Sequence, residues 1–398
     1  MIGRTMRSTA GMLAALALAA ALAPGAALAD AGTPAVPAAQ AAQAVSAKQA
    51  VEDMNIYQAI QRALARDAGL KAIDTKIALN EKRYEDELKK AKEAAGRDAN
   101  ADSERIELRK QELLYPERRL AAIADLERQK QEKADRIEAE VAELFYRVQS
   151  ASRQAEAYAA EARRLEGDIA RREAQVKAGV ATADQLFALR NALAETKSAL
   201  QQWQRTEASA RLSLNHKLGF EPDRRIALGS LSLPEEKLRI DDLDAFAAKL
   251  LPLSPAVQKR DEEARLARLE ADIVERNWKD KRPDALDGLL DQAIEAELQA
   301  EDERWAVELK LRTDYDRLLN LEDQIGIKRL ARERAELLAR AAEARHKAGL
   351  DNEGKSLEAR SALLQAEIAL EQARIDYRLA LLRFKQFTAP ALEEAAKD

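Results

Sequence analysis

Two related stretches of the chain decide its fold: Lys177–Leu200, with the sequence KAGVATADQLFALRNALAETKSAL, and Lys347–Leu370, with the sequence KAGLDNEGKSLEARSALLQAEIAL. They lie 170 residues apart and share the opening Lys-Ala-Gly and an ordered series of later identities. Single matches between Ala-rich segments are common, but a whole series in the same order around one Gly indicates an internal repeat. The sequence therefore predicts two copies of one design.

Each shared Gly is expected to be the tip of a helical hairpin. Apolar residues at steps of three and four run upstream and downstream of Gly179 and Gly349, as in helices that pack along a seam. Gly ends a helix in the left-handed conformation without steric cost, and a short polar side chain after it can cap the next helix. The candidate caps are Thr182 or Asp184 in the first copy and Asp351 or Asn352 in the second.

The two arms of each hairpin are predicted to differ in length. Long arms are expected over 116–178 and 289–348, and returning arms over 183–218 and 352–387. At a rise of about 1.5 Å per residue, the first long arm would span roughly 95 Å. The second long arm has the weaker apolar seam, which charged residues interrupt, so looser packing is expected there.

A further helix is expected before each long arm, over 56–95 and 256–279. The composition agrees, since only 14 of 398 residues are Gly and 10 are Pro, while Ala, Glu, Leu, Lys and Arg dominate as they do in long helices. The predicted fold class is therefore all-α, with two sequence repeats of long antiparallel coiled-coil helical hairpins.

The amino terminus has the three parts of a secretory signal peptide. Arg4 and Arg7 precede an apolar run over 11–22, and an Ala-x-Ala cleavage site precedes Asp30. An uncleaved anchor is the less favoured alternative. The exported chain would have a formal net charge of −7 instead of −5, which does not favour nucleic acid, and no further apolar run is long enough to span a membrane.

The predicted organisation follows from these features. It comprises a signal peptide over 1–29, a flexible leader over 30–50, the first hairpin repeat over 51–219, an extended connector with room for a short strand over 220–241, the second hairpin repeat over 242–388 and a flexible tail over 389–398.

The sequence offers little material for catalysis. The absence of Cys excludes disulfides and thiolate metal sites, and both histidines, His216 and His346, lie among basic residues on helical stretches. Paired carboxylates such as Asp241-Asp242 are typical of solvated helix faces. Nucleotide-binding, zinc-protease and calcium-loop motifs are absent. We therefore expect a protein that is not an enzyme and has no catalytic residues, cofactor or metal site.

The order of opening helix, long arm, Gly tip and returning arm, twice over, resembles the outer-membrane factor (TolC-like) family of efflux channels. The resemblance extends over nearly the whole exported chain and is carried above all by 171–219, by its repeat 341–387 and by the two repeat openings. It implies a homo-trimer whose hairpins form a helical tunnel and whose tips meet a membrane-fusion adaptor. The partner-binding tip residues that it implies are Gly179, Val180, Ala181, Thr182, Asp184, Gly349, Leu350, Asp351 and Asn352.

The sequence also departs from the family pattern. Family members insert two membrane strands of a shared β-barrel between the opening helix and the long arm of each half, and such strands need about 9 to 11 residues of alternating apolar character. The corresponding places here, 96–103 and 281–288, are short and polar. The sequence therefore predicts a variant that lacks the barrel strands.

The leading hypothesis is a non-catalytic component of an envelope efflux or export assembly, exported to the periplasm, cell envelope or exterior, which docks an adaptor or another coiled-coil export component through its tips. One alternative is a free-standing helical scaffold or spacer of the cell envelope without a transport role. Another is a module whose long faces bind polymer or membrane, although a negative net charge weighs against an anionic surface.

Overall fold

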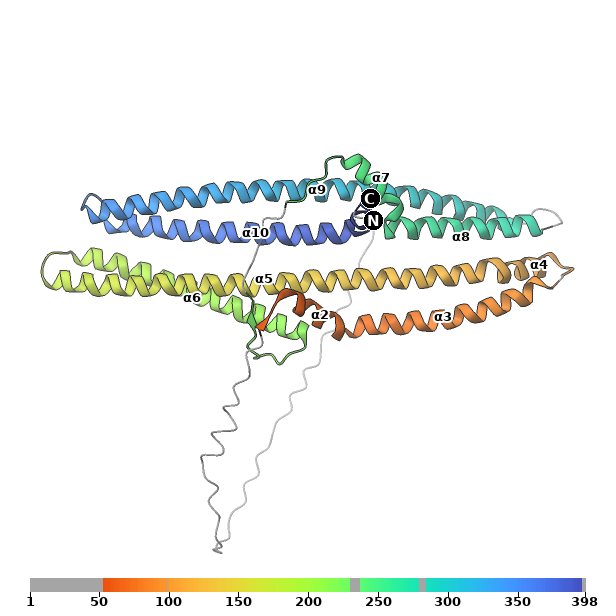
Figure 1. The fold of residues 1–398 in the computed structure, drawn as a ribbon, viewed down its shortest axis with the longest axis horizontal. Coiled ribbons are helices and arrows are strands. Elements are labelled where there is room, and N and C mark those ends of the chain that lie inside the picture. The colour runs from red at the N-terminus through yellow and green to blue at the C-terminus, as the bar shows by residue number, and fades with distance from the viewer. Residues whose placement is uncertain (1–52, 98, 230–236, 279–283, 396–398) are drawn as a thin grey trace, which may run out of the picture. The chain divides into compact units, whose positions relative to one another are not determined.

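The computed structural model describes residues 53–97, 99–229, 237–278 and 284–395. Val51–Asp398 forms one unit, within which long helices lie side by side (Figure 1). The predicted signal peptide and leader lie outside the described residues. Within these residues the secondary structure is helical apart from two short strands, so the all-α prediction is confirmed.

The first half is built around α5 (Tyr115–Lys177), a helix of 63 residues that spans about 95 Å. The returning arm α6 (Ala183–Leu218) packs along its carboxyl-terminal part, and α2 (Ile56–Arg66) and α3 (Ala68–Ala95) pack along the rest. The apolar seam of α5 is buried against these helices, with Val141, Val148 and Leu165 almost inaccessible to solvent. This burial is the main stabilising contribution to the first hairpin.

The second half repeats this plan with α7 (Leu243–Leu253), α8 (Pro255–Asn277), α9 (Asp284–Lys347) and α10 (Glu353–Ala395). The long helix α9 packs against α8 and then α10, and buries Val307, Leu311 and Leu318. The two halves join where α10 packs on α5 and where α8 packs near the start of α5. One such contact is the ion pair between Lys110 Nζ and Glu270 Oε1, at 2.7 Å.

The helix expected over 56–95 is two helices, α2 and α3. The residue between them, Asp67, has an extended backbone with φ −60° and ψ 117°, and its carboxylate accepts a hydrogen bond from the Leu70 N–H at 2.8 Å. The apolar spacing continues across the break, so periodicity alone did not reveal it. An N-cap satisfies the free N–H groups at the start of α3 and makes the interruption stable.

The first long arm begins earlier than expected. It starts with α4 (Asp102–Arg109) and passes through one π-helical turn, η1 (Lys110–Leu114), directly into α5. Pro116 had indicated a helix start at that residue. Pro lacks an N–H and its ring crowds the carbonyl four residues before it, and a wider turn immediately upstream accommodates both effects.

Three further boundaries differ from the sequence prediction. The helix α9 begins at Asp284, five residues earlier than expected, and α7 is a separate helix that the periodicity did not distinguish. The tail predicted over 389–398 is helical as far as Ala395, because α10 continues past Pro390 and buries Ala391 in the second core.

The connector between the halves is anchored to the first repeat. Its strand β2 (Ala227–Leu228) pairs in parallel with β1 (Asp53–Met54), which lies near the start of the predicted first repeat. The Phe220 ring lies between the guanidinium groups of Arg62 and Arg224, at 3.9 and 4.2 Å from the ring centroid. The described residues 220–229 of the connector thus cover the end of the first core.

Candidate docking site at the hairpin tips

Both long helices end in the same hydrogen-bonded motif. Gly179 has φ +74°, its N–H bonds to the Val176 carbonyl at 3.0 Å, and the Val180 N–H bonds to the Gln175 carbonyl at 3.0 Å. This is the Schellman arrangement, in which a left-handed residue lets two N–H groups satisfy the last free carbonyls of the helix.

The second tip repeats this geometry. Gly349 has φ +70°, and the N–H groups of Gly349 and Leu350 bond to the carbonyls of His346 and Arg345 at 3.0 and 2.9 Å. The left-handed conformation predicted for both glycines is therefore confirmed. The repeat seen in the sequence is reproduced at the level of single backbone hydrogen bonds.

One of the two candidate caps is used at each tip. The Thr182 hydroxyl accepts from the Gln185 N–H, and the Gln185 side-chain oxygen accepts from the Thr182 N–H at 3.3 Å. The Asn352 side chain accepts from the Lys355 N–H at 3.1 Å. The carboxylate of Asp351 instead bonds to the Lys355 ammonium group at 2.7 Å.

The acidic alternatives are therefore not the caps. Asp184 lies exposed in the first turn of α6, where a negative charge is favourable near the positive end of the helix dipole. The Lys355 ammonium group lowers the pKa of Asp351 below its ordinary value of 3.8.

Each tip presents one large apolar side chain to solvent. Val180 and Leu350, which follow the two glycines, are 76% and 77% exposed. No part of their own hairpins covers them, and they occupy equivalent positions in the two repeats. Two exposed apolar side chains at matching places are a feature that a partner surface can bury.

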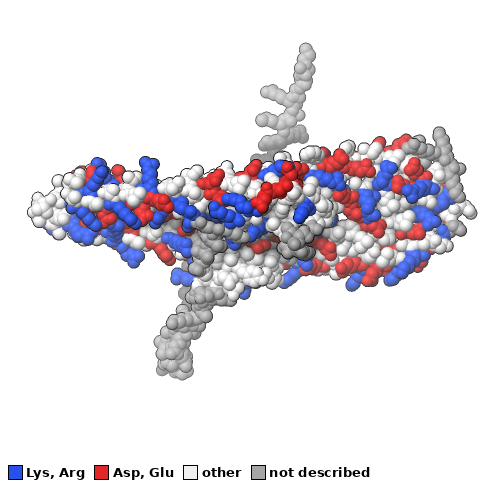
Figure 2. Space-filling view, turned by 45° about the horizontal axis from the view of Figure 1, so that its top comes forward, with Lys and Arg blue, Asp and Glu red and all other residues white. Residues whose placement is uncertain are grey.

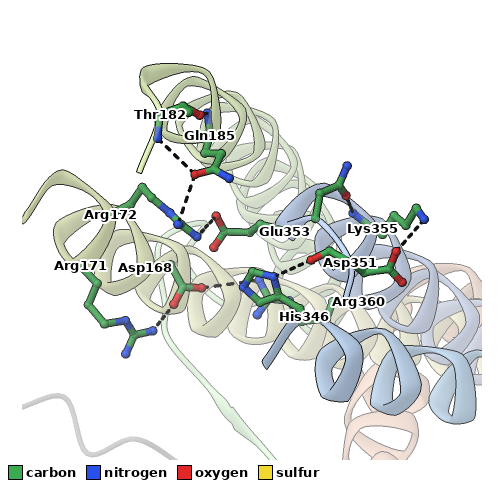
Figure 3. Close-up of polar contacts among 11 residues, drawn as sticks. Asp168, Arg171, Arg172, Thr182, Gln185, His346, Asp351, Glu353, Lys355 and Arg360 are labelled. Carbon is green, nitrogen blue, oxygen red and sulfur yellow. Dashed lines mark hydrogen bonds and ion pairs between the residues drawn. The ribbon is translucent and has the colours of Figure 1, made fainter. Parts of the chain in front are cut away.

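The two tips lie at the same end of the unit (Figure 1). Ion pairs cross between the hairpins just behind them (Figure 3). Arg172 of α5 bonds to the Glu353 carboxylate of α10 at 2.7 Å and contacts the Gln185 side chain of α6 at 3.4 Å. Arg360 of α10 contacts Asp168 of α5 at 3.7 Å. The tips are thus held together by charged groups that lie mostly out of solvent.

Basic side chains lie just behind the tips, in the last turns of the two long helices. The last turns of the long helices carry Lys177 in the first repeat and Arg345, His346 and Lys347 in the second, where cations are favourable near the negative ends of the helix dipoles. In Figure 2 the end of the unit that carries the tips is white, with Lys and Arg side chains immediately behind it. An apolar contact with cations behind it fits a partner that carries acidic groups beside an apolar patch.

The sequence analysis missed the charged residues between the hairpins. Arg190 and Arg360 occupy equivalent repeat positions, yet Arg190 pairs with Glu173 inside its own hairpin at 2.8 Å, whereas Arg360 reaches across to the other hairpin. A repeat alignment shows that these arginines correspond, but it does not show which of them faces the neighbouring hairpin. That distinction depends on how the two hairpins pack.

The described part of the chain shows neither a metal-binding cluster nor a membrane-spanning helix. It contains no group of three or more His, Asp or Glu side chains arranged to hold a metal ion. None of its helices combines the length and the apolar character needed to cross a membrane.

Comparison with known proteins gives a consistent result for the fold. No protein-family model matches the sequence, and no curated protein matches it. Among solved structures, the outer-membrane channel OprN matches with a TM-score of 0.65 and 15% identity over 84% of this chain and 90% of that chain. The open state of the Neisseria gonorrhoeae MtrE outer membrane channel matches with a TM-score of 0.65 and 12% identity over 85% and 89%.

A third solved structure, CusC, whose study concerns transmembrane channel formation, matches with a TM-score of 0.63 and 13% identity over 84% of this chain and 92% of that chain. At such low identity the likeness establishes the architecture and not the activity. The long paired helices, the doubled hairpin and these matches together show that the chain has the helical fold of the outer-membrane factor (TolC-like) channels.

Proposed function

We propose that the protein is an exported, non-catalytic component of an envelope efflux or export assembly and that its hairpin tips dock a membrane-fusion adaptor or another coiled-coil export component. The observation that carries the proposal is the pair of equivalent tips, which expose Val180 and Leu350 at one end of the unit. The fold likeness to outer-membrane channels supports the same role. We place the protein in the cell envelope on these grounds and on the predicted signal peptide.

The docking role requires that the tip residues act together. Val180 and Leu350 would contribute the apolar contact, while Gly179 and Gly349 fix the path of the backbone. Thr182 and Asn352 hold the first turns of the returning helices in place, and Asp184 and Asp351 set the local charge. This division follows from the hydrogen bonds and exposure at the tips.

A ring of copies is part of the proposal. The helix α9 packs on α7, α8 and α10 and leaves an outer face uncovered, on which Ile294, Leu298, Trp305 and Leu309 are exposed. The helix α3 packs on α4, η1 and α5, and its outer face carries Leu79 among lysines. The amino-terminal part of α9, over 284–310, is rich in Asp and Glu. The charge of α3 in one copy would therefore complement that of α9 in the next.

Such a contact joins two different faces of neighbouring copies, and repeated contacts of this kind form a ring when the rotation between copies closes. We propose three copies, the number that the family resemblance implies.

Binding to the partner tests the docking role. The exported chain is mixed with the purified coiled-coil segment of a membrane-fusion adaptor from the same organism, and affinity is measured by interferometry. Val180→Asp together with Leu350→Asp should weaken binding by roughly tenfold or more, because two apolar contacts are lost and charges are introduced at the interface.

The matched control is Tyr57→Asp together with Leu212→Asp, which places charges at two other exposed apolar positions. This control should bind like the wild type. Equal binding by the tip variant and the wild type, at unchanged helicity, would discard the docking role and favour a helical spacer or scaffold of the envelope.

A further inference from the structure

A charged pocket of about 370 Å³ lies between the two hairpins, behind the tips. Its walls come from α5, α9 and α10, so both halves of the chain contribute to it. Its volume lies within the range of sites that hold small molecules, roughly 300 to 1,000 Å³. Figure 3 shows several of its side chains converging from the two hairpins. We call it the interhairpin pocket.

Cations predominate in the walls of the interhairpin pocket. The cationic side chains are Arg164, Arg171, Arg172, Lys347 and Arg360. The acidic ones are Asp168, Glu343 and Glu353. Four guanidinium groups and one ammonium group carry far more N–H donors than three carboxylates have lone pairs. The pocket is therefore short of acceptors, even though Arg360 also contacts Glu161 beside it at 3.4 Å.

The carboxylates are shared between cations instead of matched one to one. Glu343 lies between Lys347, at 3.0 Å, and Arg164, at 3.5 Å. Lys347 is the main cause of the lowered pKa of Glu343, so this carboxylate is ionised at neutral pH. Asp168 is likewise divided between Arg171 of its own helix and Arg360 of α10.

Two buried donors remain without an acceptor. The Nε atoms of Arg172 and Arg360 are inaccessible to solvent and have no hydrogen-bond partner. These two arginines come from opposite hairpins and both line the interhairpin pocket. A buried donor that lacks a partner costs free energy, and an added acceptor between the hairpins would recover part of it.

We propose that the interhairpin pocket binds a small multivalent oxyanion, of the phosphate or polycarboxylate class. Its oxygens would accept hydrogen bonds from guanidinium groups of both hairpins, because a guanidinium group can bind two oxygens of a carboxylate or phosphate at once. The ligand would neutralise the excess positive charge and join α5 to α10 behind the tips. This inference does not depend on whether the tips dock a partner.

Titration calorimetry on the exported chain tests the proposal, with pyrophosphate and citrate as the probes and sodium chloride added to keep the ionic strength constant. Saturable binding of at least one probe, with one ligand per chain, is expected. The informative variant is Arg171→Gln together with Lys347→Gln. These side chains are 76% and 73% exposed, so their loss should leave the helicity intact.

Affinity for the probe should fall by roughly tenfold or more in this variant, because two charge-assisted contacts are removed. The matched control is Arg163→Gln together with Arg340→Gln, which removes the same charge from the same two helices outside the interhairpin pocket. The control should bind like the wild type. The absence of saturable binding to both probes, or an equal loss in the pocket variant and the control, would overturn the proposal.

Discussion

At the scale of single residues, the most informative positions are Gly179 and Gly349, which combine a left-handed backbone with open surroundings. A Cβ atom built on either residue would meet no atom within 4 Å. The penalty for replacing them therefore comes from backbone conformation alone, and not from a clash.

Replacement of Gly179 or Gly349 by Val should lower the free energy of unfolding by about 1 kcal/mol or more, since L-residues adopt the left-handed region only at a cost. Helicity measured by circular dichroism should stay nearly unchanged. Gly167, inside the last third of α5 and also in open space, is the matched control, because Gly167→Ala should raise stability by roughly 0.5 to 1 kcal/mol. If the free energy of unfolding changed in the same direction at a tip glycine and at Gly167, the result would contradict this account.

A second residue, Glu270, predicts a pH dependence. Burial by itself would raise its pKa, but hydrogen bonds and charges from Lys110 and Arg118 outweigh burial and hold the pKa below the ordinary value of 4.5. A carboxyl whose pKa is lower in the folded state stabilises the fold above its unfolded pKa. That stabilisation is lost as the pH falls through the folded pKa.

Denaturant unfolding at pH values from 7 to 3 measures this effect. The wild type should lose stability steadily below about pH 4.5, and Glu270→Gln should be less stable at pH 7 but should lose less on acidification. Glu275→Gln, at an exposed position of the same helix, should follow the wild-type curve. Parallel curves for the wild type and Glu270→Gln would show that the ion pairs of Glu270 do not contribute to acid sensitivity.

At the scale of helices and strands, the sequence predicted the hairpins well and their interruptions poorly. The arm α6 begins at Ala183 and ends at Leu218, as expected, because a capping Thr precedes it and a left-handed Gly follows it. The break at Asp67 was missed because the apolar spacing continues across it. The continuation of the first long arm upstream of Tyr115 was missed because Pro116 indicated a helix start. Heptad spacing reports which face is buried, whereas a single side-chain hydrogen bond or π turn decides where a long helix bends.

Core and surface positions within one helix should differ sharply in the effect of truncation. Leu214 of α6 is 1% exposed and belongs to the first core, whereas Leu212, two residues before it, is 51% exposed. Leu214→Ala should cost about 2 to 5 kcal/mol in the free energy of unfolding. Leu212→Ala should change it by no more than about 0.5 kcal/mol. Similar losses at the two positions would show that α6 packs on a different face.

At the scale of the whole molecule, the unpartnered face of α9 is the feature that sequence reasoning did not identify. Part of the second long arm buries its apolar seam, yet the same helix exposes Trp305, at 71%, and neighbouring aliphatic side chains. Periodicity could not separate these two faces, since both follow helical spacing. The sites between the hairpins could not be predicted either, because they depend on how the two repeats pack against each other.

Trp305→Ser together with Leu309→Ser should therefore reduce self-association while leaving the fold intact. Sedimentation equilibrium gives the mass directly. We expect the wild type to form a trimer and the variant to shift towards the monomer, because two exposed apolar side chains are removed from the proposed contact. A wild-type chain that stays monomeric at all concentrations would contradict the ring, though not the docking role of the tips.

The docking role of the tips can be tested most directly by photo-crosslinking in the native cell. A photoreactive amino acid is placed at Val180 or Leu350, or at Tyr57 as an exposed position away from the tips. Cells are irradiated and the crosslinked proteins are identified by mass spectrometry. Our account predicts that both tip positions yield an adduct with a membrane-fusion adaptor or another coiled-coil export component, and that Tyr57 yields none with it. Failure of both tip positions to crosslink such a component, in cells that express it, would contradict the account.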